Sequence, residues 1–146
     1  MAKYQQGIFK PKFPEKYKGD ASNIIYRSSW ERACMNKFDL HSDVIQWSSE
    51  ETIIPYRSPI DGRMHRYFVD FFVKIRDRNG QIRTVLIEVK PKAQTVPPTP
   101  SKGKLTKRYL IEVQTWGVND AKWKAARAYC KQHGYEFEII TEDNLF

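Results

Sequence analysis

Two apolar runs of the sequence, each interrupted by a single carboxylate, constrain the fold more than any other feature. The first run covers residues 67–73 with Asp70 at its centre, and the second covers residues 84–90 and contains Glu88. Aromatic and β-branched residues dominate both runs, so both are predicted to be strands. Burying an ionised carboxylate among apolar side chains costs free energy unless a cation compensates its charge. Two such acids on adjoining strands therefore indicate a shared cationic partner, and a divalent metal ion would serve.

The turn between the two strands decides whether the two acids can meet. A two-residue turn would place Asp70 and Glu88 on opposite faces of the sheet. A three-residue loop at residues 78–80, with Gly80 left-handed in a bulge, instead places Asp70 directly opposite Glu88. Their Cβ atoms would then lie about 4.5–5.5 Å apart. Lys90 would share this face because side chains alternate along a strand. The metal-site hypothesis therefore predicts the bulged turn.

The length and charge of the chain limit its class. A chain of 146 residues suits one domain with a substantial core. We expect a soluble protein that is not secreted, since no apolar run approaches the ~20 residues of a membrane span and the N-terminus lacks a signal-peptide core. Cys34 and Cys130 lack a metal-ligand spacing, which argues against zinc. The formal charge of +8 favours a polyanionic partner, but charge alone does not separate DNA from RNA or an acidic protein.

Residues 1–19 are predicted to form a basic, extended N-terminal arm that precedes a single domain of residues 20–146. Lysines alternate with aromatic residues in this arm, and prolines disfavour a helix. The arm could track phosphates through residues such as Lys10 and Lys12. Alternatively, its aromatic side chains could pack on the domain while the lysines stay solvated.

A first helix is predicted from Ser28 or Ser29 to about Leu40, because apolar residues recur at helical spacing. Two readings of Glu31 are open at this helix start. In the first, Ser28 and Glu31 form a capping box, in which Glu31 only stabilises the first turn. In the second, Glu31 is a third acid that points at the proposed metal site.

The rest of the chain is predicted to complete a mixed α/β fold of strands and helices. Residues 44–47 and 52–56 favour strands, and residues 104–116 are compatible with a helix or a strand. Asn119 could cap a helix that runs to about His133 and stops at Gly134, before a strand at residues 135–140.

Two further features lie near the predicted metal site. Residues 91–108 form a basic, proline-rich loop directly after Lys90, which could grip a nucleic-acid backbone or be a solvated insertion. His65 precedes Asp70 and could approach a phosphate or act as an auxiliary base. A structural role at the start of a strand would explain His65 equally well.

The sequence resembles the PD-(D/E)XK nuclease superfamily in the order of its acidic motifs, which are helical Glu31, Val69-Asp70 and Glu88-Val89-Lys90. The segments at residues 27–31 and 65–71 more specifically resemble TnsA-type transposon endonucleases. In its size, its basic N-terminus and its overall course, the chain resembles the head-completion nucleases of T-even-type tailed phages. The resemblance covers roughly residues 20–142, and Val69 stands where the superfamily has proline.

This resemblance implies a single-domain, restriction-endonuclease-like α/β fold and a DNA endonuclease that depends on Mg²⁺ or Mn²⁺. Asp70, Glu88 and the carbonyl of Val89 would bind the metal, since oxygen ligands suit such cations. Glu31 would bind a second metal, or the first through water. Lys90 would orient the attacking water and offset the charge that develops on the phosphate.

The phage resemblance further implies that the protein processes packaged DNA ends before tail attachment, in the virion or in the cytoplasm of an infected host. Head or neck proteins would be its partners. The candidate DNA contacts are the basic residues nearest the site and in the arm: Lys10, Lys12, His65, Lys92, Lys102, Lys104, Lys107 and Arg108. Alternatively, the chain is a DNA-binding module or a structural virion head protein that has a nuclease-like fold and does not cut.

Overall fold

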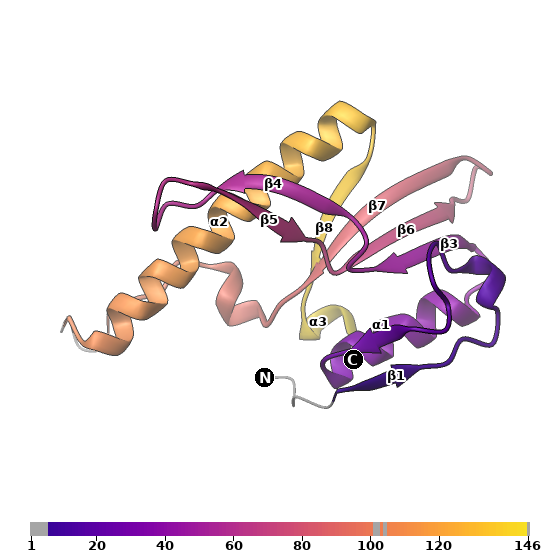
Figure 1. Cartoon of the computed structure of the whole chain (residues 1–146), viewed down its shortest axis with the longest axis horizontal. Coiled ribbons are helices and arrows are strands. Elements are labelled where there is room, and N and C mark those ends of the chain that lie inside the picture. Colours follow the sequence, from indigo (N-terminus) through magenta and orange to yellow (C-terminus); the bar gives the residue numbers. More distant parts are fainter. Residues whose placement is uncertain (1–5, 101–102, 104, 146) are drawn as a thin grey trace.

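A four-stranded mixed sheet forms the centre of the molecule (Figure 1). The computed structural model describes residues 6–100, 103 and 105–145. The strands lie in the order β3 (Val44–Ser49), β6 (Phe71–Arg76), β7 (Ile82–Val89) and β8 (Glu136–Ile140). The pair β7–β8 is parallel, and the other two neighbouring pairs are antiparallel. The predicted mixed sheet is therefore confirmed.

Helices cover both faces of this sheet and complete three layers. Helix α1 (Ser29–Leu40) packs on one face, where Phe38 meets Trp47 and Phe71 in one core cluster. Helix α2 (Lys107–His133) covers the other face with a cluster that contains Phe72 and Trp123. Phe71 and Phe72 enter different clusters because successive side chains of a strand point to opposite faces. A single α/β domain with a mixed sheet between helices is confirmed.

Helix α2 is longer than the sequence pattern predicts. It begins after Thr106, whose side chain accepts a hydrogen bond from the Tyr109 N–H at 3.0 Å, and it continues to Gly134. The expected helix start at Asn119 is therefore wrong, since Asn119 is a buried residue inside the helix. The first turns gave an ambiguous pattern because their apolar side chains, Leu110, Ile111 and Val113, are exposed and form no buried stripe. The basic loop is correspondingly shorter and includes a 3-10 turn, η2 (Lys92–Thr95).

A separate hairpin, β4 (Ile53–Arg57) and β5 (Met64–Phe68), packs on α2 rather than joining the main sheet (Figure 1). The predicted single strand over residues 67–73 is therefore broken into β5 and β6. Backbone hydrogen bonds hold this corner, from the Val69 N–H to the Thr52 carbonyl at 3.0 Å and from the Glu50 N–H to the Asp70 carbonyl at 3.1 Å. Asp70 thus lies where the chain passes from the hairpin into the main sheet.

The described part of the N-terminal arm packs against the α1 side of the domain. Strands β1 (Gly7–Phe9) and β2 (Ile24–Tyr26) pair in an antiparallel hairpin, and a 3-10 turn, η1 (Pro14–Lys16), follows β1. Phe9 and Tyr17 are buried in the core. The packing alternative therefore describes these aromatic residues, and the division of the chain at residue 19 stays a prediction.

The C-terminal segment ends in a short helix, α3 (Glu142–Leu145), which contacts α1 and β8. Among the described residues, no helix combines the length and apolarity that crossing a membrane requires.

Candidate active site

The turn between β6 and β7 sets the register that the site needs. The Asp77 N–H donates to the Gln81 carbonyl at 2.8 Å, and the Gly80 N–H donates to the Asp77 carbonyl at 3.0 Å. Gly80 has a φ of 77°, in the left-handed region. The strands pair Phe71 with Ile87, so one step further Asp70 faces Glu88. The predicted bulged turn is confirmed.

Asp70 lies at the corner between β5 and β6 and is half-buried. Its Oδ2 accepts a hydrogen bond from the Val89 N–H at 2.8 Å, which ties the corner before β6 to the end of β7. Burial raises the pKa of Asp70 well above its usual range, and the charge of Glu88 raises it further. Two carboxyl groups this close repel each other when both are ionised.

Glu88 is more deeply placed, with 5% of its surface exposed. Its Oε2 accepts a hydrogen bond from Nε1 of Trp123, on α2, at 3.0 Å. Within the described residues, neither Glu88 nor Asp70 forms an ion pair with a Lys or Arg side chain. The two acids are therefore oriented by neutral N–H groups, and their negative charge is uncompensated.

Tyr67 places a buried hydroxyl next to the pair. Among the described residues this hydroxyl makes no hydrogen bond of good geometry, although the Glu88 carboxylate is close enough to interact with it. Burial raises the pKa of Tyr67, and the charges of Glu88 and Asp70 raise it further, so the hydroxyl lies within the field of both acids. Two converging carboxylates are a donor set that fits a hard, hydrated divalent cation such as Mg²⁺.

Replacing Tyr67 by Phe is expected to raise the free energy of unfolding by about 1 kcal/mol without added metal, because a buried hydroxyl without a well-formed hydrogen bond is destabilising. Urea unfolding in EDTA would measure this change. Tyr17→Phe is the matched control, since the buried Tyr17 hydroxyl accepts a hydrogen bond from the Ser49 N–H at 3.1 Å and its loss should destabilise the fold. Equal destabilisation of both variants would show that the Tyr67 hydroxyl has a partner.

Glu31 sits at the start of α1 in a capping arrangement. The Ser28 Oγ accepts from the Glu31 N–H at 3.1 Å, and Oε1 of Glu31 accepts from the Arg27 N–H at 3.3 Å. Burial raises the pKa of the Glu31 carboxyl. Across the described part of the chain, no three His, Cys, Asp or Glu side chains are grouped to hold a metal ion. Asp70 and Glu88 thus converge as a pair, and a metal-binding role for Glu31 stays a prediction.

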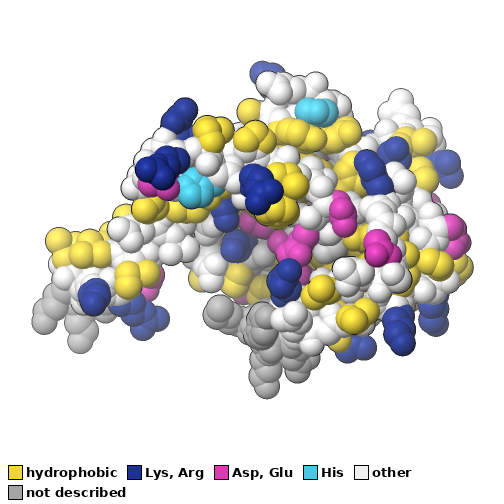
Figure 2. Space-filling view, in the orientation of Figure 1, with side chains coloured by type: hydrophobic (Ala, Val, Ile, Leu, Met, Phe, Trp, Pro, Cys, Tyr) yellow, Lys and Arg dark blue, Asp and Glu magenta, His cyan; other side chains and the backbone are white. Residues whose placement is uncertain are grey.

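Lys90 follows β7 directly, and its N–H donates to the Ile140 carbonyl at 3.0 Å. The side chain is partly buried and, by alternation along the strand, shares the α2 face with Glu88. The predicted roles of Lys90 and of the Val89 carbonyl remain predictions. Figure 2 shows acidic side chains gathered near the middle of one face of the molecule, with Lys and Arg side chains on either side.

The predicted DNA contacts after β7 are partly engaged with neighbouring acids. Lys92 Nζ lies 3.0 Å from Asp143 Oδ2, and Arg108 Nε lies 3.2 Å from Glu112 Oε1. Lys107 is exposed in the first turn of α2. Lys102 and Lys104 fall outside the described residues.

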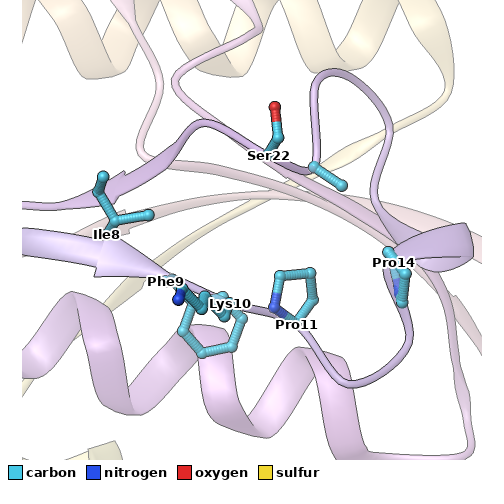
Figure 3. A pocket seen from close by; sticks show the side chains of 7 residues that line it. Ile8, Phe9, Lys10, Pro11, Pro14 and Ser22 are labelled. Atoms are coloured by element: carbon cyan, nitrogen blue, oxygen red, sulfur yellow. The ribbon is translucent and has the colours of Figure 1, made fainter.

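The other predicted DNA contacts lie on the β4–β5 hairpin and on the N-terminal segment. His65 Nε2 lies 2.8 Å from Asp61 Oδ2 within the β4–β5 hairpin. Lys10 and Lys12 are exposed on the N-terminal segment, where Lys10 lines a pocket of about 440 Å³ with residues such as Ile8 and Ser22 (Figure 3). None of the residues lining this pocket belongs to the carboxylate site. DNA binding by these residues stays a prediction.

Sequence reasoning missed two residues of the site. The sequence pattern places Trp123 only in a predicted helix and Tyr67 only in a predicted strand. Their polar atoms reach Glu88 and its surroundings from separate elements, α2 and β5, and no spacing in the sequence signals this meeting. Lys122, next to Trp123, also lies close, with Nζ 5.5 Å from the centre of the Tyr67 ring.

Comparisons with known proteins show the family to which the chain belongs. Residues 41–142 match the family model described as the TnsA-like endonuclease N-terminal domain. The chain belongs to the TnsA-like endonuclease family. It is also 41% identical over 142 residues to the head completion nuclease of Enterobacteria phage T4, covering 95% of this chain and 92% of that protein.

The TnsA-like match confirms the family and the nuclease class expected from the sequence. The matched range contains Asp70, Glu88 and Lys90, and it begins after Glu31. The similarity to the phage protein extends over nearly the whole chain.

Proposed function

We propose that this TnsA-like endonuclease is a DNA endonuclease that uses Mg²⁺ or Mn²⁺ held by Asp70 and Glu88. The observation that carries the proposal is the convergence of two acids on one face, each hydrogen-bonded by a neutral N–H and neither paired with a basic side chain of the described residues. A metal ion would compensate the charge that the protein leaves uncompensated.

Each residue of the proposed site would have a separate role. A bound divalent cation would polarise the scissile phosphate and lower the pKa of the attacking water. Asp70 and Glu88 would hold the cation, with the Val89 carbonyl as a further oxygen donor. Lys90 would orient the attacking water and offset the negative charge that grows on the phosphate. Glu31 would act on a second cation, or through water on the first.

DNA is the substrate that the family and the charge favour. The formal charge of +8 gives the protein a long-range attraction for a polyanion. The basic residues around the site and in the N-terminal segment would contact the phosphate backbone.

The phage relative supports a role late in capsid assembly. It is named a head completion nuclease, and the similarity covers 92% of its length. We therefore assign to this protein the processing of packaged DNA ends before tail attachment, with head or neck proteins as partners. Its place would be the virion or the cytoplasm of the infected host.

Nicking of supercoiled plasmid in Mg²⁺, Mn²⁺ or EDTA tests the proposal, with Lys90→Ala beside the wild type. We expect nicking with either ion and none in EDTA. Lys90→Ala should be about 10²–10³-fold slower, the usual effect of removing one group that stabilises developing charge.

Lys37→Ala is the matched control, because Lys37 is exposed in the last turn of α1. It should cut at the wild-type rate. The enzyme proposal fails if wild-type protein cuts no DNA, supercoiled, linear or single-stranded, with either ion. DNA binding that persists in that case would favour the non-catalytic alternative.

A further inference from the structure

The side chain of Glu88 is held from the side of α2 by an indole. Trp123 has 3% of its surface exposed, so solvent does not compete for its N–H. The bond from Nε1 to Oε2 of Glu88 measures 3.0 Å and joins α2 to the end of β7. This hydrogen bond directly links helix α2 to the proposed cation site.

A second tryptophan shows that this bond is not simply what any buried indole must form. Nε1 of Trp47 is buried in the cluster on the α1 side and, in the part of the chain that the structure describes, has no hydrogen-bond partner. The fold therefore accommodates an unpaired indole N–H in its core. The pairing of Trp123 with Glu88 is a specific feature of the site.

The chemistry of the donor suits a carboxylate that must still bind a cation. A Lys or Arg at this place would form a charge-assisted pair with Glu88 and compete with a metal ion. A neutral N–H fixes the orientation of the carboxylate and leaves its charge in place. Asp70 is held in the same way, by the Val89 N–H at 2.8 Å. Ligand carboxylates in metal sites are commonly hydrogen-bonded by such outer groups.

We propose that Trp123 is a positioning residue for the cation site: its indole N–H fixes one oxygen of Glu88 so that the other is available to the metal shared with Asp70. This inference rests on the proposed function, because it assigns Glu88 as a ligand. It adds a residue of α2 to a site otherwise built from the ends of β5, β6 and β7.

Nuclear magnetic resonance of the ¹⁵N-labelled wild type tests the proposal without altering the fold. The indole N–H signal of Trp123, assigned as the one that moves in Glu88→Gln, should shift when Mg²⁺ is added. The Trp47 indole signal should stay in place, since its N–H lies in the core cluster on the α1 side of the sheet. If the Trp123 signal did not shift at saturating Mg²⁺ while other signals from the site shifted, only the positioning role would be overturned. A protein with no Mg²⁺ response at all would overturn both this role and the cation site of the proposed function.

Calorimetric titration with Mn²⁺ gives the size of the effect. Trp123→Phe keeps an aromatic ring and removes the N–H, and it should bind Mn²⁺ about 10–100-fold more weakly, as expected for loss of an outer-shell partner. Trp116→Phe is the matched control: Trp116 packs edge-on against Trp123 with ring centres 6.0 Å apart, so its change perturbs the same packing without the bond to Glu88.

A double variant separates positioning from general destabilisation. If Trp123 acts through Glu88, adding Trp123→Phe to Glu88→Gln should weaken Mn²⁺ binding no further. Full additivity of the two changes, or wild-type Mn²⁺ affinity in Trp123→Phe, would contradict the proposal.

Discussion

Replacing Asp70 by Asn, or Glu88 by Gln, is expected to slow cation-dependent cleavage by at least about a thousandfold, because the metal is bound more weakly and several kcal/mol of its charge stabilisation is lost. Both changes keep the shape of the side chain. Asn retains an oxygen that can accept from the Val89 N–H, and Gln retains one for the Trp123 indole. The variants therefore remove charge and preserve the hydrogen bonds that position the site.

Single-turnover cleavage of plasmid, with folding checked by thermal unfolding, measures this effect. Asp120→Asn is the matched control, since Asp120 lies on α2 and pairs with Lys124 at 2.8 Å. The control should cut at the wild-type rate. If Asp70→Asn or Glu88→Gln kept activity within tenfold of the wild type, the pair would not be the cation site.

The same pair should make the metal-free protein less stable as the pH rises. Burial, and then the charge of Glu88, raises the pKa of the Asp70 carboxyl in the folded protein. The unfolded chain releases that proton near pH 4, its ordinary pKa, while the folded protein keeps it to higher pH. The contribution to stability is thus complete below pH 4 and is lost as the pH rises through the raised pKa.

Asp70→Asn cannot titrate at this position, so in EDTA above that range it should exceed the wild type in unfolding free energy by on the order of 1–3 kcal/mol. Mn²⁺ should reverse the order, because it binds the folded wild type and not the variant. Urea titrations between pH 4 and pH 8, with EDTA and with Mn²⁺, give both comparisons. If the unfolding free energies of the two proteins changed with pH in parallel, the hypothesis that the charge of this pair is uncompensated would be refuted.

The sequence predicted the parts of the site that depend on local rules. The left-handed Gly80 and the alternation along two strands were sufficient to place Asp70 opposite Glu88. The capping residues Ser28 and Glu31 likewise located the start of α1 correctly. These features follow from neighbours in the chain, and local chemistry therefore determines them.

Features set by packing between distant elements were not predicted. Residues 67–73 read as one strand because the bend after Phe68 depends on hydrogen bonds to residues 50–52. The first turns of α2 present exposed apolar residues, so their periodicity gave no clear signal. The bond from Trp123 to Glu88 joins residues 35 apart and depends on how α2 lies across the sheet.

The corner at Asp70 offers a way to change the position of this carboxylate through the backbone. The carboxylate sits between two β-ladders, and the turn before β4 helps hold its main chain through the Glu50 N–H. Glu50 itself has a φ of 57°, a strained conformation for a residue with a side chain. Redesigning that short turn would therefore shift the main chain that carries Asp70 while leaving every side chain of the proposed cation site unmutated.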